Sequence, residues 1–252
     1  MKRLLLVAVL LAGCGDSEHS RPAAPSAPPP LAKRCGSAHA QWRTLWFHAS
    51  DGTRLDGAES GTGERGVILL HESPSDLCGW EPYGAELGRR GFRVFMIDLR
   101  TFGLSGRGPY GGLRGAVADV RGAVDELKRL GAKRVAVVGA SYGGVTALVT
   151  APALGSQISG VASLSGELAL ASAGLKTLPA MPKIRVPLLI MGSRKDHYLD
   201  ETDARQLIRA ATSTHAKLVE FDGTDHGWSL LAFSHKQRAY EVLVGFLRRV
   251  TE

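Results

Sequence analysis

Residues 133–149 read KRVAVVGASYGGVTALV, a hydrophobic run that ends in Gly139-Ala140-Ser141-Tyr142-Gly143 and continues into a segment compatible with a helix. Glycines two positions before and two positions after Ser141 permit a tight strand-to-helix turn, because they carry no Cβ atom that would clash with the backbone. Such a turn holds the serine hydroxyl clear of its neighbours. The stretch therefore predicts a nucleophile elbow with Ser141 as the nucleophile, and the pattern around it has to support that prediction.

Short apolar runs typical of buried strands alternate with helical patterns along the rest of the chain. Two segments that flank Asp51-Gly52 indicate a β-hairpin. The later predicted strands occupy residues 66–72, 92–99, 134–140, 158–165, 186–193 and 216–223. The predicted helices occupy residues 80–90, 117–130, 142–151, 201–211 and 236–250. This alternation predicts an α/β fold with a mainly parallel central sheet covered by helices on both faces.

Ligands of such sheets bind beyond the carboxyl ends of the strands, so polar residues there are the candidates for chemistry. A serine hydroxyl is a weak nucleophile at neutral pH and needs a base and a carboxylate that orients the base. His226 lies in the glycine-flanked loop after the last predicted strand, and Asp196 follows strand 186–193. The order Ser141, Asp196, His226 predicts a catalytic triad. Three carboxylates compete with Asp196 for the role of the acid: Glu167, Asp200 and Asp203.

Together these features resemble the α/β-hydrolases over roughly residues 42–250. The resemblance implies a central sheet of about eight strands and no metal or organic cofactor. It also implies an oxyanion hole made by two backbone N–H groups, one from Tyr142 and one from Ser73, which ends the segment His71-Glu72-Ser73. Residues 166–186, where many relatives insert a helical cap, have room for one short helix, so we expect an open site with minimal or no cap.

Glu72 departs from the glycine that is usual in this loop of the family. A carboxylate here resembles the dienelactone hydrolases, whose loop reads Gln-Glu and whose nucleophile is usually cysteine, whereas this chain has Ser141. Glu72 is therefore a candidate for modulating the site, and the alternative is that it pairs with an arginine or caps a loop.

Residues 98–105 match the family pattern Asp-x-Arg-Gly-x-Gly-x-Ser, with Thr101 in place of a glycine, and we interpret this loop as architectural. Four aromatic residues are candidates for lining the open site: Trp80, Tyr142, Tyr198 and Trp228.

The N-terminus carries Lys2 and Arg3, an apolar run over residues 4–12, and Leu11-Ala12-Gly13-Cys14. The run is shorter than the about 20 residues that span a bilayer. It resembles a bacterial lipoprotein signal peptide, which implies cleavage after residue 13 and palmitate or similar acylation of Cys14. We therefore expect a lipid-anchored protein on the extracytoplasmic side of the cell envelope. The alternative is an ordinary secretory signal with an incidental cysteine.

Residues 14–41 are rich in proline, alanine and serine, which predicts a semi-rigid tether ahead of a domain at residues 42–252. If Cys14 is acylated, Cys35 and Cys78 remain as an even pair in an oxidising compartment. They form either a disulfide or two free thiols.

Composition limits the classes of function. The chain of 252 residues is 44% hydrophobic and 22% charged, which is typical of one globular domain. Its net charge of +7 comes from scattered basic residues without interleaved aromatics, which argues against nucleic-acid binding. We therefore predict a serine hydrolase that cleaves a small-molecule carboxylic ester, with lactone and amide substrates open because they use the same machinery. The alternative is a non-catalytic lipoprotein that uses the scaffold to bind a ligand or partner.

Overall fold

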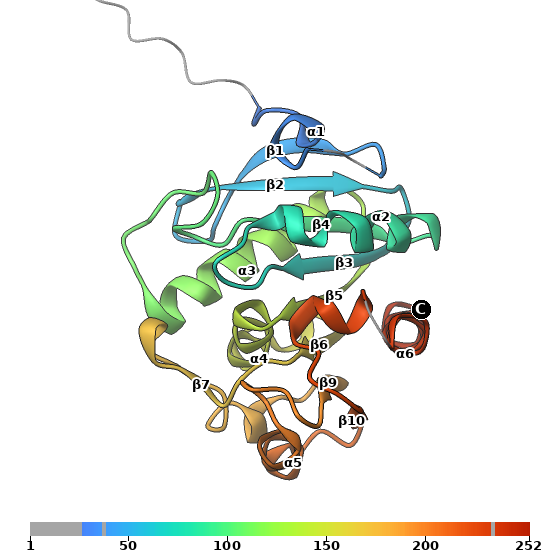
Figure 1. Cartoon of the computed structure of the whole chain (residues 1–252). Coiled ribbons are helices and arrows are strands. Elements are labelled where there is room, and N and C mark those ends of the chain that lie inside the picture. The colour runs from blue at the N-terminus through green and yellow to red at the C-terminus, as the bar shows by residue number, and fades with distance from the viewer. Residues whose placement is uncertain (1–26, 37–38, 233–234) are drawn as a thin grey trace, which may run out of the picture.

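The computed structural model describes residues 27–36, 39–232 and 235–252 (Figure 1). The predicted signal peptide, the lipidation site Cys14 and the first part of the predicted tether lie outside the described residues. None of the helices within the described ranges is long and apolar enough to cross a membrane.

An eight-stranded sheet forms the centre of the molecule, in the order β1-β2-β4-β3-β5-β6-β9-β10. The strands are β1 Arg43–His48, β2 Arg54–Ser60, β3 Arg65–Leu70, β4 Arg93–Ile97, β5 Arg134–Ala140, β6 Gly160–Leu164, β9 Leu188–Ser193 and β10 Ala216–Phe221. The β1–β2 and β2–β4 pairs are antiparallel, and every other pair in this sheet is parallel. The predicted fold class, with its N-terminal hairpin and mainly parallel sheet, is confirmed.

Helices cover both faces of the sheet (Figure 1). They are α1 Leu31–Arg34, α2 Glu81–Arg89, α3 Gly112–Arg129, α4 Tyr142–Leu154, α5 Glu201–Ala210 and α6 Lys236–Thr251. One hydrophobic cluster contains side chains of α3, α4 and α5, and the other contains side chains of α1, α2 and α6. Strand β3 shows why: Ile68 and Leu70 belong to the first cluster, and Val67 and Leu69 to the second, because successive side chains of a strand point to opposite faces.

Short 3₁₀ helices join several elements: η1 Leu77–Trp80, η2 Gly155–Gln157, η3 Ala171–Ala173, η4 Met181–Lys183 and η5 Gly227–Leu231. The segment 166–186 contains no α-helix. It forms a two-stranded ladder of β7 Ala169–Leu170 and β8 Leu175–Lys176, together with η3 and η4. The segment has room for one short α-helix but forms none, because Gly174 takes a left-handed φ of 64° and Pro179 and Pro182 interrupt the remaining stretch.

Part of the predicted tether packs on the domain. Leu31 is 2% exposed and belongs to the core, although it falls in the predicted tether. Cys35 forms a disulfide with Cys78, with a Cα–Cα distance of 5.3 Å. Thr44 of β1 donates a hydrogen bond to the carbonyl of Pro28. Residues 28–36 therefore pack on the domain that we predicted to begin at residue 42. The sequence did not indicate these contacts, because the segment is rich in proline, which predicts a tether.

Candidate active site

Ser141 lies between β5 and α4 in a strained backbone conformation, with φ 49° and ψ −114°. A Cβ atom at Gly139 would lie 2.0 Å from the carbonyl oxygen of Gly143, and one at Gly143 would lie 2.1 Å from that of Leu70. Both positions therefore need glycine, and the turn packs directly against the end of β3. Non-glycine residues with positive φ cost energy and are concentrated at functional sites. The Ser141 side chain lies in the elbow that the sequence predicted.

Asp196 lies just after β9, and His226 lies near the end of the loop that follows β10. The Nδ1 atom of His226 lies 2.8 Å from Oδ2 and 2.9 Å from Oδ1 of Asp196. Asp196 is 2% exposed, and its Oδ1 also accepts the Tyr198 N–H group, which fixes the carboxylate. A proton held on Nδ1 leaves Nε2 as the basic atom. Of the competing carboxylates, Asp200 caps α5 by accepting the Asp203 N–H group at 2.9 Å.

The loop of His226 reaches the elbow of Ser141. A Cβ atom on Gly227 would lie 3.7 Å from the Cβ of Ala140, so the residues next to His226 and Ser141 in the sequence lie close together. Among the hydrogen bonds of the described residues, none joins Ser141 Oγ to His226 Nε2. In structures without substrate this catalytic hydrogen bond is often long or misaligned and shortens in the reacting complex.

Three carboxylates set the charge of His226. Burial opposes protonation of the ring, but the hydrogen bond and charge of Asp196, with the charges of Glu72 and Glu167, outweigh it and raise the pKa of His226. Burial in turn raises the pKa of Glu72 and of Glu167, although His226 opposes both shifts. The surrounding carboxylates therefore stabilise the imidazolium form of His226 relative to a free histidine.

The segment of the predicted oxyanion hole is held by His71. This residue is fully buried, and its Nε2 accepts the Leu99 N–H group at 3.1 Å, so the ring proton lies on Nδ1, which donates to the Glu72 carbonyl at 3.0 Å. Burial lowers the pKa of His71, which keeps the ring neutral. The Ser73 N–H group donates to no other described residue, and Tyr142 is the first residue of α4, whose N–H group has no partner within the helix. Both amides are available to an oxyanion.

Glu72 contacts the loop of the base. Its Oε2 accepts the Trp228 N–H group at 3.4 Å and occupies the space that a Cβ on Gly227 would fill, at 1.9 Å. No arginine of the described residues forms an ion pair with Glu72. Of the two alternatives for a structural role, the loop contact is the one present.

A cavity of about 410 Å³ opens beside the two predicted oxyanion donors. Its lining includes Ser73, Tyr142, Phe102, Arg107 and Tyr110. Neither Ser141 nor His226 is part of the lining. Of the candidate aromatic residues, Tyr142 lines the cavity, Tyr198 is 55% exposed with its ring 4.8 Å from that of His226, and Trp80 is buried in the core.

The sequence analysis did not assign the residues at 107–112 to the site. The signal was present, because RGPYGG is rich in glycine and proline and follows the strand end at Asp98.

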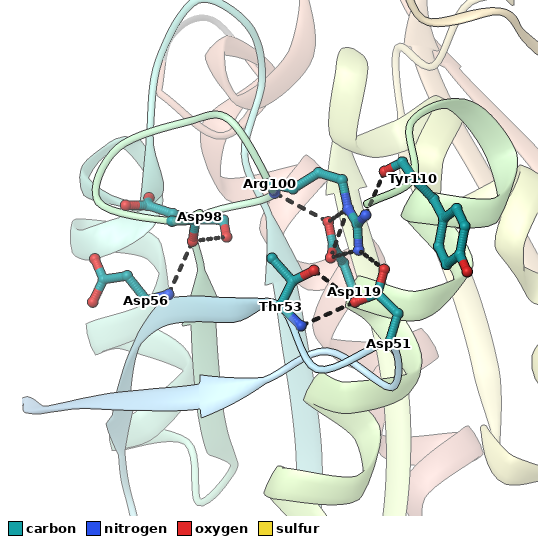
Figure 2. Close-up of polar contacts among 8 residues, drawn as sticks. Asp51, Thr53, Asp56, Asp98, Arg100, Tyr110 and Asp119 are labelled. Atoms are coloured by element: carbon teal, nitrogen blue, oxygen red, sulfur yellow. Dashed lines mark hydrogen bonds and ion pairs between the residues drawn. The ribbon is translucent and has the colours of Figure 1, made fainter. Parts of the chain in front are cut away.

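The loop after β4 is anchored as we interpreted it. Figure 2 shows the guanidinium of Arg100 between Asp119 and Asp51, with Nη2–Oδ distances of 2.7 and 2.9 Å. Arg100 also donates to the carbonyl of Tyr110, which fixes the far end of the loop. Thr101 has a φ of 72°, which explains why glycine is usual at this position.

The described residues contain no cluster of histidine, cysteine and carboxylate side chains suited to a metal ion.

Comparisons with known proteins agree with this fold. The sequence matches the family model described as the alpha/beta hydrolase fold over residues 67–181. An esterase of Pyrococcus furiosus superposes with a TM-score of 0.77 at 18% identity and covers 90% of this chain and 98% of its own. A monoacylglycerol lipase of Paleococcus ferrophilus gives a TM-score of 0.66 at 19% identity, with coverages of 77% and 98%. An enol-lactonase of Burkholderia xenovorans gives 0.64 at 21% identity, with coverages of 80% and 99%. No curated protein sequence matches the chain.

Proposed function

Because the chain has the α/β-hydrolase fold, we propose that it is a serine hydrolase that cleaves a carboxylic ester through an acyl-enzyme. The observation that carries the proposal is the placement of Ser141, at a φ of 49°, against the loop of a histidine whose Nδ1 is bound to a buried aspartate. A solvated loop histidine has no need of a buried carboxylate, whereas a general base does.

The residues supply each step of acyl transfer. Ser141 Oγ attacks the ester carbonyl while His226 Nε2 accepts its proton, and Asp196 stabilises the imidazolium that forms. The oxyanion accepts hydrogen bonds from the N–H groups of Ser73 and Tyr142, each of which contributes about 3 kcal/mol to lowering the barrier. His226 then protonates the departing alkoxide, and a water activated by the same nitrogen hydrolyses the acyl-enzyme.

The cavity supports one arrangement for the two halves of the substrate. The leaving group lies beside His226, which protonates it, and the acyl group occupies the cavity of about 410 Å³, whose lining includes both proposed oxyanion donors, Ser73 and Tyr142. Arg107, Tyr110 and Thr146 give that cavity a partly polar wall, which favours short or polar acyl groups over long alkyl chains. The similar structures include an esterase, a lipase and an enol-lactonase, so both open-chain esters and lactones fit the proposal.

A panel of p-nitrophenyl esters, lactones, amides and peptides tests the proposal on the purified protein. We expect turnover of short esters that is lost in Ser141→Ala. Full activity in Ser141→Ala would overturn the assignment of the nucleophile.

Labelling with a fluorophosphonate probe separates this function from the alternative of a non-catalytic binding lipoprotein. Stoichiometric labelling at Ser141 identifies an activated nucleophile. A folded protein that takes up no label favours the binding function instead.

We also propose that the protein is anchored to the bacterial cell envelope through lipidated Cys14. The sequence around Cys14 supports this location, and so does the Cys35–Cys78 disulfide, which suits an oxidising compartment. Metabolic labelling with an alkyne fatty acid should mark the wild type and not Cys14→Ser. An unlabelled wild type contradicts the anchor.

A further inference from the structure

Two aspartates lie side by side in the interior, and both pair with one arginine that reaches the surface. Asp56 of β2 and Asp98 after β4 are both fully buried. Nη2 of Arg34 lies 2.5 Å from Oδ2 of Asp56 and 3.2 Å from Oδ2 of Asp98. No other lysine or arginine within the described ranges pairs with either carboxylate. Because an uncompensated buried charge is strongly unfavourable, Arg34 is the counter-ion of the pair.

Asp98 binds one N–H group in each of two loops: the loop that contains η1 and the loop of residues 98–105. Its Oδ1 accepts the N–H group of Leu77 at 2.8 Å, and its Oδ2 accepts that of Leu104 at 3.0 Å. Leu77 begins η1, and Leu104 lies in the loop of residues 98–105. Ser105 joins the two aspartates, because its hydroxyl donates to the Asp98 carbonyl and accepts the Asp56 N–H group. Figure 2 shows Asp56 on β2 and Asp98 just after the end of the neighbouring strand β4.

The first of these loops supports the base. Gly79 of η1 is packed so closely on Trp228 that a Cβ atom there would lie 2.0 Å from the indole ring. The rings of Trp80 and Trp228 are 5.9 Å apart in an edge-to-face arrangement, and Trp80 Nε1 donates to the Leu70 carbonyl at the end of β3. Trp228 lies two residues after His226. The position of η1 therefore sets the position of the loop that carries the base.

The second loop supports the oxyanion hole. Phe102 packs edge-on against His71, with ring centroids 4.8 Å apart, and against Tyr142, with centroids 5.2 Å apart. These two residues hold the two sides of the oxyanion hole, since His71 orders the segment of Ser73. One carboxylate thus organises the surroundings of the base and of both oxyanion donors.

The counter-ion of that carboxylate comes from the N-terminal segment that precedes the first strand of the sheet. Residues 31–36, which we call the N-terminal strap, carry Arg34 in α1 and Cys35 next to it. The disulfide ties Cys35 to Cys78 of η1, 43 residues later, and Leu31 anchors the strap in the core. The strap is therefore bound at the same short helix that Asp98 holds.

We propose that Arg34 is a positioning residue for catalysis, that it acts through Asp98 on the two loops beside Ser141, and that the Cys35–Cys78 disulfide keeps it in place. This inference rests on the proposed hydrolase function. Through Arg34, the N-terminal strap is then part of the catalytic unit. A dithiol reduces the disulfide to two thiols and is itself oxidised to a cyclic disulfide, so reduction frees the strap and lowers turnover.

The test compares variants of the full chain on a p-nitrophenyl ester at about pH 8, where aspartates are normally ionised. We expect Arg34→Met to lower kcat about tenfold with little change in KM, because the loops move while the substrate contacts remain. Adding Asp56→Asn to Arg34→Met should restore most of kcat, since the single remaining carboxylate keeps its two amide donors. Lys33→Met is the matched control, because Lys33 is an exposed residue on the same short helix, and its kcat should stay at the wild-type value.

The second arm uses the wild-type sequence, so it does not depend on a variant folding. Dithiothreitol should lower the kcat of the wild type by a similar factor but change Arg34→Met little, because both treatments remove the same contact. Fluorophosphonate labelling of Ser141 should slow in parallel. An Arg34→Met protein with wild-type kcat, or a folded double variant no faster than the single one, overturns the role of Arg34. A wild type that neither turns over an ester nor takes up the probe overturns the hydrolase function and this inference with it.

Discussion

Asp196 binds the Nδ1 atom of His226 with both carboxylate oxygens, at 2.8 and 2.9 Å, from an almost fully buried position. An asparagine would present an amide N–H group that cannot accept the Nδ1 proton, so the ring would adopt the tautomer with Nε2 protonated. Asp196→Asn should therefore lower kcat by roughly 10³ to 10⁴ while the melting temperature changes little. Steady-state kinetics on a p-nitrophenyl ester checks this.

Asp200→Asn is the matched control, because Asp200 was a competing candidate for the acid and instead caps α5. Asparagine is also a good helix cap, so both kcat and stability should stay near wild type. Loss of kcat in Asp200→Asn with activity retained in Asp196→Asn would reverse the assignment.

Glu72 should tune the pH dependence of the reaction. The base acts only when His226 is neutral, so the acid limb of kcat/KM follows its pKa. The charge of Glu72 contributes to raising that pKa, so Glu72→Gln should lower it and move the acid limb to lower pH. The charge of Glu167 acts in the same direction, and Glu167→Gln should give a shift of the same sign.

The measurement is kcat/KM against pH for both variants, with Glu64→Gln as the control, because Glu64 is an exposed partner of Lys133. A limb that stays in place or moves to higher pH in Glu72→Gln contradicts this role for the carboxylate.

These two predictions also show which parts of the candidate site could be predicted from the sequence. The elbow, the acid and the base follow from local patterns, because glycine spacing and the ends of strands are properties of short segments. The contact of Glu72 with Gly227 and Trp228 joins residues 155 and 156 positions apart, and no periodicity reports it. Arg34 is even harder to identify from the sequence. The proline, alanine and serine around it predict a tether, and only the folded chain brings Arg34 to two aspartates.

The buried pair should make stability depend on pH in an unusual direction. Burial, together with the charge of Asp98, raises the pKa of Asp56 from 3.8 to about 7, although Arg34 opposes the shift. Between these values the folded protein keeps a proton that the unfolded chain has released. The free energy of unfolding contributed by Asp56 is therefore greatest below the lower value and falls as pH rises to about 7.

Asp56→Asn removes this titration. We expect the wild type to lose stability relative to Asp56→Asn as pH rises from about 5 to 7, by up to roughly 1.4 kcal/mol per pH unit. Urea unfolding at several pH values measures the difference. A constant difference across this range excludes the titration of Asp56.

The cavity beside Tyr142 should select the acyl group. Ala173 of η3 lines the cavity and is only partly buried. Ala173→Trp should lower kcat/KM for a hexanoate ester about tenfold and leave that for an acetate ester nearly unchanged, because only the longer acyl group needs the space. Ala171→Trp, at an exposed position of the same turn outside the lining, should discriminate neither ester. Equal losses on both esters in Ala173→Trp would place the acyl group elsewhere.

Two glycines of similar chemistry should respond to alanine in opposite directions, because their surroundings differ. A Cβ atom at Gly143 would lie 2.1 Å from the Leu70 carbonyl oxygen and 2.7 Å from that of His71, both backbone atoms that cannot turn aside. Gly143→Ala should push the elbow away from the oxyanion segment, lowering kcat and destabilising the fold by a few kcal/mol. At Gly245 in α6 the nearest atom is the end of the Arg249 side chain at 3.6 Å, so Gly245→Ala should stabilise the helix by about 1 kcal/mol without changing kcat. Thermal unfolding and ester kinetics on both variants check the pair, and a Gly143→Ala protein with wild-type kcat contradicts the close approach of the elbow to β3.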